Sequence, residues 1–245
     1  MDRLSAVGIP RAGARGALNI AVATLALAAG VYQPPTHAVT AQAAAQHGTL
    51  AVVVRTTATA RPPLRVSVDA NICGDAVPDE SVVLTRGLVA NAVVTLPGLP
   101  GTHPASVDIV NDRCRFVPHV AIAAPGAALR MVSRDATLHT VHAEHRGKSL
   151  FNVGLPVPNL TLTRPAQGNG PVALKCNTHP WMSGFVFLAA DRAVLTGQDG
   201  SAAFAQLPAG SHTVTVWHEV LGTASAVASI EAGRHTSVEI TLPGK

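Results

Sequence analysis

Residues 172–188 read Val172-Ala173-Leu174-Lys175-Cys176-Asn177-Thr178-His179-Pro180-Trp181-Met182-Ser183-Gly184-Phe185-Val186-Phe187-Leu188. The segment begins and ends with short apolar runs, 172–175 and 184–188, which are typical of buried β-strands. The loop between them is short, and its proline stiffens it by fixing its own φ angle. The stretch therefore predicts two strands of a β-sheet that carry Cys176, His179 and Met182 on one tight connection.

The side chains of this loop form a soft set of potential metal ligands. A thiolate, an imidazole and a thioether together favour copper over magnesium, calcium or manganese. A trigonal blue-copper site also needs a second imidazole, which the upstream run Leu138-His139-Thr140-Val141-His142 offers. A lone Cys-x-x-His could instead be half of a zinc site, but the sequence contains no second pair of that kind. The non-functional interpretation is a buried thiol, a surface histidine and a methionine that fills a gap in the core.

The loop also resembles that of a known family. Cys176-x-x-His179-Pro180-aromatic-Met182, followed by Gly184, is similar to the copper loop of the amicyanins, small members of the cupredoxin (blue copper) family. The run from His139 to His142 is similar to the His-Asn-Val-His of the same family. The resemblance covers about residues 127–188 and implies a Greek-key β-sandwich with one type 1 copper. It implies His139, Cys176 and His179 as equatorial ligands and Met182 as the axial ligand.

The chain departs from the family at Thr140, where an asparagine usually ties the two ligand loops together. Two further histidines are alternative ligands. Residues 139 and 142 lie on opposite faces of a strand, so normally only one of them can point into the site, and the resemblance favours His139 over His142. His119 could approach the copper if a disulfide anchors Cys114 near it, or it could line an adjacent surface.

The N-terminal segment predicts export. An apolar run, residues 17–31, follows three arginines, Arg3, Arg11 and Arg15, and a cut site of the A-x-A type ends at Ala43. We therefore expect residues 1–43 to be a signal peptide, with cleavage after Ala38 or retention as an anchor as alternatives. The apolar run falls short of the about 20 residues that a membrane span needs, so we expect no span in the mature chain. The expected location is periplasmic or otherwise exported.

Composition narrows the function classes. The formal net charge of the chain is +4, and residues 1–43 contribute +2 of it through one aspartate and three arginines, which leaves about +2. That balance excludes the basic footprint of a nucleic-acid-binding protein. Three cysteines are an odd number for an exported chain. If Cys176 binds copper, Cys73 and Cys114 remain as a disulfide pair in an oxidising compartment, and two unrelated buried thiols are the alternative.

Strand candidates separated by Pro- and Gly-rich breaks follow the signal, and strong helical periodicity appears only in the signal itself. The architecture is therefore predicted to be all-β. We expect a cupredoxin-type copper domain over residues 47–190, followed by a small β-sandwich module over residues 191–245. Residues 196–216 resemble the carboxypeptidase regulatory-like (transthyretin-like) module, which implies no peptidase activity. Because a module of this size buries little surface alone, we expect it to pack on the copper domain or to borrow a strand from it.

One pair of side chains in that module has two interpretations. His218 and Glu219 follow Trp217 directly. They could form a catalytic pair or a second metal site, or they could be polar neighbours of an aromatic core residue at the end of a strand.

Together these features predict an exported blue copper protein that carries single electrons and has no substrate chemistry of its own. The resemblance suggests a c-type cytochrome or a periplasmic dehydrogenase as its partner. We expect such a partner to dock where Pro180 and Trp181 form an apolar patch beside an exposed ring edge of His179. A copper carrier or sensor and a mononuclear copper enzyme are the alternatives. The His-x-His pairs of a multicopper oxidase are absent from the sequence.

Overall fold

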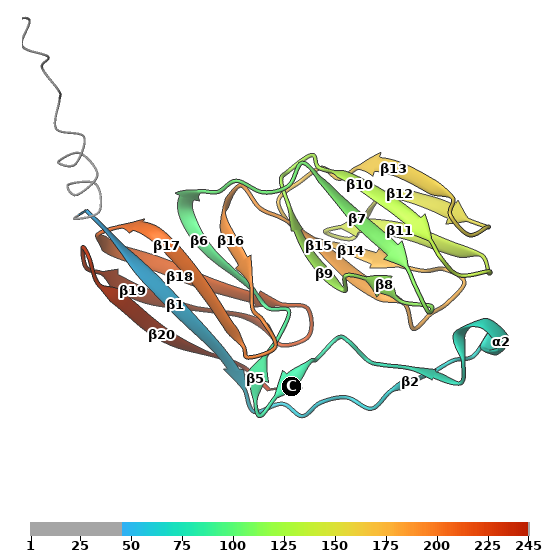
Figure 1. The fold of residues 1–245 in the computed structure, drawn as a ribbon, viewed down its shortest axis with the longest axis horizontal. Coiled ribbons are helices and arrows are strands. Elements are labelled where there is room, and N and C mark those ends of the chain that lie inside the picture. The colour runs from blue at the N-terminus through green and yellow to red at the C-terminus, as the bar shows by residue number, and fades with distance from the viewer. Residues whose placement is uncertain (1–45, 245) are drawn as a thin grey trace, which may run out of the picture. The chain divides into compact units, whose positions relative to one another are not determined.

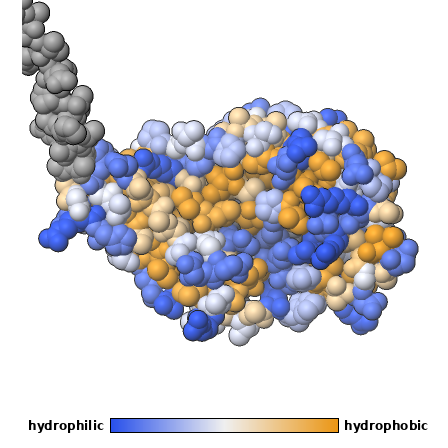
Figure 2. Space-filling model, viewed as in Figure 1, coloured by the Kyte–Doolittle hydropathy of each residue, from blue (hydrophilic) through white to orange (hydrophobic). Residues whose placement is uncertain are grey.

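The computed structural model describes residues 46–244, in which almost all of the regular secondary structure is β-strand. The prediction of an all-β fold is confirmed. The predicted signal peptide, residues 1–43, lies outside the described range. Within that range no helix is both long and apolar enough to cross a membrane. Hydrophobic and hydrophilic surface are interspersed over the face of the molecule in Figure 2.

The strands belong to two sandwiches with separate cores, which we call the outer sandwich and the inserted sandwich (Figure 1). The strands of the outer sandwich are β1 (His47–Thr56), β4 (Leu84–Thr85), β5 (Leu88–Val89), β6 (Val93–Pro100), β16 (Asp191–Leu195), β17 (Ser201–Pro208), β18 (Gly210–His218), β19 (Gly222–Ile230) and β20 (His235–Leu242). One sheet has the order β17-β1-β5-β4, with β20 also paired to β1. The other has the order β16-β6-β18-β19.

The inserted sandwich lies between β6 and β16 in the sequence. Its strands are β7 (Ser106–Asn111), β8 (Phe116–Val117), β9 (Val120–Ala123), β10 (Ala128–Ser133), β11 (His139–His145), β12 (Lys148–Leu155), β13 (Thr161–Pro165), β14 (Gly170–Lys175) and β15 (Ser183–Leu188). They form one sheet of order β13-β10-β7-β8 and one of order β12-β11-β14-β15-β9. The two strands that flank the Cys176 loop are β14 and β15, paired from Lys175 opposite Ser183.

A third segment, residues 57–83, leaves the outer sandwich after β1 and returns to it at β4. We call it the strap. It holds the short strands β2 (Leu64–Arg65) and β3 (Ala76–Val77), which pair with each other, and the four-residue helix α2 (Ala70–Cys73) (Figure 1). A disulfide joins Cys73 of the strap to Cys114, just before β8 of the inserted sandwich. The strap is thus covalently fastened to a domain from which it is distant in sequence.

Strand β1 explains why the outer sandwich needs both ends of the described chain. Every second residue of β1 is buried, and Leu50, Val52 and Val54 have no exposed surface. This alternation is that of a strand with one face in the core. β1 pairs in parallel with β20 and antiparallel with β17, so the core needs residues from both sides of the inserted sandwich.

The domain boundaries that we expected, 47–190 and 191–245, do not coincide with these cores. We expected the C-terminal module to pack on the copper domain or to borrow a strand from it, and in the structure the C-terminal strands share their sheets and core with β1, β5 and β6. Backbone pairing closes the junction itself, since Asp191 pairs with Pro100 and Gly101 N donates to Ala190 O at 2.9 Å. The resemblance to the carboxypeptidase regulatory-like module stays a prediction.

Candidate metal centre

Three side chains converge at one end of the inserted sandwich. His139, Cys176 and His179 each offer a donor atom, and the three atoms lie within 4.8 Å of one another. Cys176 Sγ is 3.5 Å from Nδ1 of His179 and 4.0 Å from Nδ1 of His139. A nitrogen about 2.1 Å and a sulfur about 2.3 Å from one ion are at most about 4.4 Å apart, so both pairs of atoms fit a shared metal ion. All three residues are buried, and neither histidine has exposed surface.

Local sequence places these three residues. β11 begins at His139, and its alternating burial turns His139 and Val141 inward and His142 outward. Cys176 directly follows β14, and the loop after it closes tightly, because Met182 N donates to His179 O at 3.0 Å and Cys176 N donates to Met182 O at 3.3 Å. β11 and β14 are neighbours in one sheet, so the start of β11 meets this loop.

Hydrogen bonds favour the thiolate form of Cys176. Sγ accepts from Thr140 N at 3.3 Å and lies 3.0 Å from Thr178 Oγ1. Burial alone would raise the pKa of Cys176, but the hydrogen bonds from His139 and from the backbone N–H of Thr140 are the main effects that outweigh it, and the pKa is lowered to about 5. The metal-free protein therefore presents an anionic sulfur, which is the form that binds a metal.

Thr140 joins the loop that carries Cys176 and His179 to the start of β11, where His139 lies. Its Oγ1 accepts from Asn177 N at 2.6 Å and lies 3.7 Å from Cys176 Sγ. Thr178 adds a second link, because its Oγ1 donates to Leu138 O at 3.0 Å. The hydroxyl groups of two threonines thus connect the start of β11 to the Cys176 loop.

Asp135 fixes the orientation of His139. Nε2 of His139 lies 3.0 Å from Asp135 Oδ2, which leaves Nδ1 to face Cys176. Burial opposes protonation of His139, but the hydrogen bonds and charges of Asp135 and Cys176 outweigh it and raise the pKa of His139 to about 9. Asp135 is itself held by the backbone N–H groups of Arg113 and Cys114, at 2.8 and 2.9 Å. A carboxylate behind a ligating histidine is a common way to fix its tautomer.

His179 has the same arrangement, with an aspartate from the strap. Its Nε2 lies 3.1 Å from Asp69 Oδ2, and its Nδ1 faces Cys176. The hydrogen bonds from Thr137 and His179 lower the pKa of Asp69. The expectation that His179 exposes a ring edge is therefore wrong, because the strap lies against that edge and the residue has no exposed surface.

The other loop residues surround these donors. Met182 is 3% exposed and belongs to the same core cluster as Cys176. Pro180 is exposed, whereas Trp181 is half-buried. The ring of Trp181 lies 5.1 Å from that of His179, and its Nε1 donates to Cys114 O at 3.2 Å.

The two alternative histidines lie outside the cluster. Nε2 of His142 is 3.0 Å from Ser149 Oγ on the opposite face of β11. His119 is buried, and its Nε2 forms a very short contact with Glu219 Oε1 of the outer sandwich. Burial lowers the pKa of His119, but Glu219 outweighs this and raises it. His119 therefore takes part in an ion pair between the two sandwiches.

His218 stays neutral beside that ion pair. It is 3% exposed, and its Nδ1 accepts from the backbone N–H groups of Val220 and Leu221, each at 3.2 Å. Burial, the positive charge of His119 and that of Arg61 lower its pKa to about 4. His218 and Glu219 thus act separately, the first as a turn acceptor and the second as the partner of His119.

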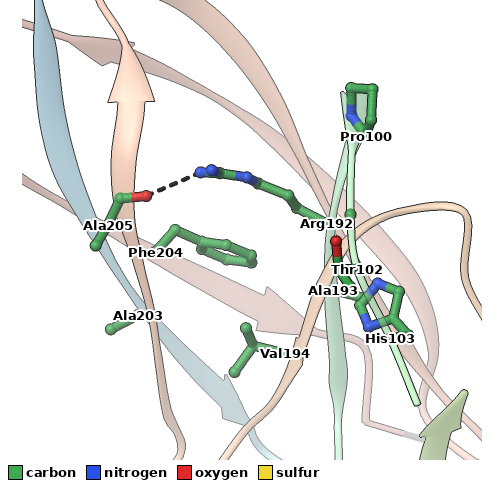
Figure 3. Close-up of a pocket in the computed structure, with 10 residues that line it drawn as sticks. Pro100, Thr102, His103, Arg192, Ala193, Val194, Ala203, Phe204 and Ala205 are labelled. Carbon is green, nitrogen blue, oxygen red and sulfur yellow. Dashed lines mark hydrogen bonds between the residues drawn. The ribbon is translucent and has the colours of Figure 1, made fainter. Parts of the chain in front are cut away.

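Other places in the described residues offer less to a metal. A second group of potential ligands, Cys114, Asp135 and His139, shares His139 with the first and includes a sulfur that is committed to the disulfide. A surface pocket of about 380 Å³ lies among β6, β16 and β17, where Arg192 donates to Ala205 O beside Phe204 and Val194 (Figure 3). Its histidine, His103, lies 2.7 Å from Asp191 O.

Sequence reasoning missed the two aspartates. Asp135 lies four residues before His139, a spacing that carries no known signature in a loop. Asp69 lies far from the ligand loop in sequence. The expected disulfide was the one available signal for it, because a Cys73–Cys114 bond brings the segment around Asp69 to the inserted sandwich.

No protein-family model and no curated protein matches the chain. Several solved structures do. A purple cupredoxin from Nitrosopumilus maritimus is 20% identical, with a TM-score of 0.30, over 34% of this chain and 99% of that one. Amicyanin from Paracoccus versutus is 14% identical, with a TM-score of 0.31, over 39% of this chain and 97% of that one. A copper-containing nitrite reductase from Thermus scotoductus is 16% identical, with a TM-score of 0.30, over 38% of this chain and 24% of that one.

Proposed function

We propose that this protein is an exported type 1 copper protein that carries single electrons between redox partners. The observation that carries the proposal is the convergence of His139 Nδ1, Cys176 Sγ and His179 Nδ1 in a buried cluster. Two imidazoles and a thiolate, with a methionine on the same loop, are the donor set of a blue-copper site. Met182 would be the axial ligand. When bound there, copper would supply a one-electron Cu(II)/Cu(I) couple.

The protein's own residues would keep this donor set fixed. Asp135 and Asp69 hold the two histidines by their far nitrogens, and the threonine hydroxyls hold the Cys176 loop against β11. Donors that are fixed before the metal binds lower the rearrangement that accompanies a change of oxidation state. Burial of all three also keeps water from the sulfur. This rigidity supports an electron carrier more than an enzyme, which needs an open coordination position.

Export is supported by the disulfide between Cys73 and Cys114, since such bonds persist in oxidising compartments. For a partner we propose a c-type cytochrome or a periplasmic dehydrogenase that docks at Pro180 and Trp181. The indole of Trp181 gives that surface a contact with the buried ring of His179. An electron could then leave through the Trp181 side of the ring, although the strap occupies its Nε2 edge.

A second candidate function is a copper carrier or sensor that binds copper reversibly. The observation that favours it is the closure of the His179 edge by Asp69, because an exposed ring edge is the simplest exit for an electron. A carrier needs a site that opens rather than one that conducts. The two candidates differ in whether bound copper undergoes reversible oxidation and reduction without leaving the protein.

The test is addition of one equivalent of Cu(II) to the metal-free protein, followed by visible absorption and electron paramagnetic resonance. We expect an intense blue band with narrow copper hyperfine splitting, both lost in Cys176→Ala and His139→Ala. His142→Ala is the matched control, because it removes an imidazole from the opposite face of the same strand, and it should keep the colour. A pale wild-type product would overturn the blue-copper assignment. Voltammetry of the blue protein then separates an electron carrier, with a reversible couple, from a copper carrier, which loses Cu(I).

A further inference from the structure

Asp69 contacts the metal centre from outside the inserted sandwich. Asp69 lies immediately before α2 and has a left-handed backbone conformation, with φ 54° and ψ 33°. Its Oδ2 accepts from Thr137 Oγ1 at 2.5 Å and from His179 Nε2 at 3.1 Å. One carboxylate oxygen thus spans the loop before β11 and the ring of His179, where solvent would otherwise reach the imidazole.

The disulfide attaches the strap to Cys114, a residue that contacts the surroundings of the same centre. Cys73 lies at the end of the helix that follows Asp69, and its partner Cys114 has two further contacts. Cys114 N donates to Asp135, which orients His139, and Cys114 O accepts from the indole of Trp181. One covalent bond therefore connects the cover of His179 to the residues that position the other histidine and the ligand loop.

The strap has two further contacts with the inserted sandwich, because Glu80 pairs with Arg115 at 3.1 Å and Val66 packs against the core of that sandwich. Most of its residues are exposed, and the buried ones are Cys73, Val77 and Val82. Two of its apolar side chains, Val68 at 44% and Ile72 at 39%, remain open to solvent. A segment with few buried contacts opens locally at a lower free energy than the strands beneath it. We therefore expect the strap to open locally around Asp69, as far as the disulfide allows, without unfolding the sandwich.

We propose that the strap is a cover that controls exchange of the metal ion. Asp69 holds the cover closed over His179, and the Cys73–Cys114 disulfide keeps it attached when it opens. While Asp69 contacts His179, Nε2 of the ring faces Asp69, Nδ1 faces Cys176, and the edge of the ring is shielded. A chelator or an incoming ion reaches this side of the centre only after Asp69 leaves. Asp69 is a positioning residue here, since it acts on the metal through His179. The inference rests on the proposed copper site.

The first experiment measures the rate at which a Cu(I)-specific chelator, bicinchoninate, removes Cu(I) from the reduced, loaded protein. We expect Asp69→Ala to raise this rate about 10-fold or more, since loss of such outer partners typically weakens metal binding by about 10–100-fold. Asp75→Ala is the matched control, because it removes an exposed carboxylate six residues further along the same strap, and its rate should match that of the wild type. Cys73→Ser with Cys114→Ser should also speed removal, with Asp69 intact. Equal rates in the wild type and Asp69→Ala would refute the cover.

A second measurement needs no copper and so separates this inference from the proposed function. Diethyl pyrocarbonate modifies accessible imidazole nitrogens, and mass spectrometry of peptides reports each histidine. In the metal-free wild type we expect His179 to be protected, and in Asp69→Ala to be modified at least about fivefold faster, with His139 protected in both. If copper does not bind but His179 shows this difference, the shielding of His179 by the strap stands, whereas the blue-copper function and the control of copper exchange fail. If copper binds and His179 is equally reactive in both proteins, the cover fails alone.

Discussion

Removing the imidazole of His218 should abolish a specific loss of stability at acidic pH. The folded protein holds His218 neutral, with a pKa lowered to about 4, because the residue is buried and lies near the positive charges of His119 and Arg61. A proton on Nδ1 would also displace the two backbone N–H groups that this nitrogen accepts. In the unfolded chain the same ring has a pKa near the ordinary value of about 6.5. Between these two values the unfolded state binds the proton and the folded state does not.

The sign and size of the effect follow from this difference. A depressed histidine pKa lowers stability as pH falls through about 6.5, and the loss levels off below the folded pKa of about 4. A full difference of about 2.5 units corresponds to about 3 kcal/mol at 1.36 kcal/mol per unit. Between pH 7 and pH 4.5, most of this, about 2–3 kcal/mol, should be lost.

The assay is urea unfolding of the metal-free protein at both pH values, followed by tryptophan fluorescence, since Trp217 adjoins His218 and packs against Phe185. The variant is His218→Asn, because the amide oxygen can replace Nδ1 as an acceptor but does not titrate. Other groups titrate equally in both proteins, so the quantity of interest is the wild type minus the variant. His212→Asn, on the same strand, serves as a control. If the difference between wild type and His218→Asn changes by less than about 0.5 kcal/mol between the two pH values, the assignment of a buried neutral His218 is refuted.

Two further substitutions test the contacts around the sandwiches and the loop. Glu219→Ala should lower the free energy of unfolding at pH 6 by about 3 kcal/mol, because it leaves the buried, protonated His119 without its partner. The loss should shrink as pH rises, since the pKa of His119 is raised and its charge disappears through that pKa. Glu239→Ala, which breaks an exposed pair with Arg55, should cost less than about 1 kcal/mol, and equal losses in the two variants at pH 6 would contradict the buried ion pair. Met182→Leu should still bind one copper through the two imidazoles and the thiolate but shift its reduction potential, as measured by voltammetry; an unchanged potential would exclude Met182 as the axial ligand.

Local sequence carried most of the information about the metal centre. Cys176, His179 and Met182 lie within seven residues, so their proximity depends only on a short loop between two strands that are adjacent in sequence. His139 could be placed because alternation along a strand separates it from His142, and the structure has this alternation. The charges that hold the two imidazoles were not predictable in this way. Asp69 reaches His179 through the path of a long irregular segment, which no periodicity encodes.

The division of strands between the two sandwiches was not predictable for a similar reason. β1 has a clear strand pattern, but the pattern states only that one face is buried and not which strand lies beside it. Its partners, β17 and β20, begin at Ser201 and His235. Parallel strands such as β1 and β20 are not joined by a hairpin, so no turn motif in the sequence indicates that they pair. The expected boundary at residue 190 followed chain order, whereas the core follows these long-range pairs.

The parallel pairing of β1 with β20 also has a consequence for the order in which the two sandwiches can be completed during synthesis. During synthesis β1 is made first, with the apolar side chains of Leu50, Val52 and Val54 still exposed. The edge of β1 that pairs with β20 stays open until residues 235–242 have been made. The last strand of the inserted sandwich, which carries the candidate metal centre, ends at residue 188, long before this. Domains generally fold as units as they become available, so the inserted sandwich should be able to fold while the outer sandwich is still incomplete. A fragment ending at residue 190 would keep the donor atoms and the strap but leave β1 as an unprotected apolar edge, prone to pair with other copies.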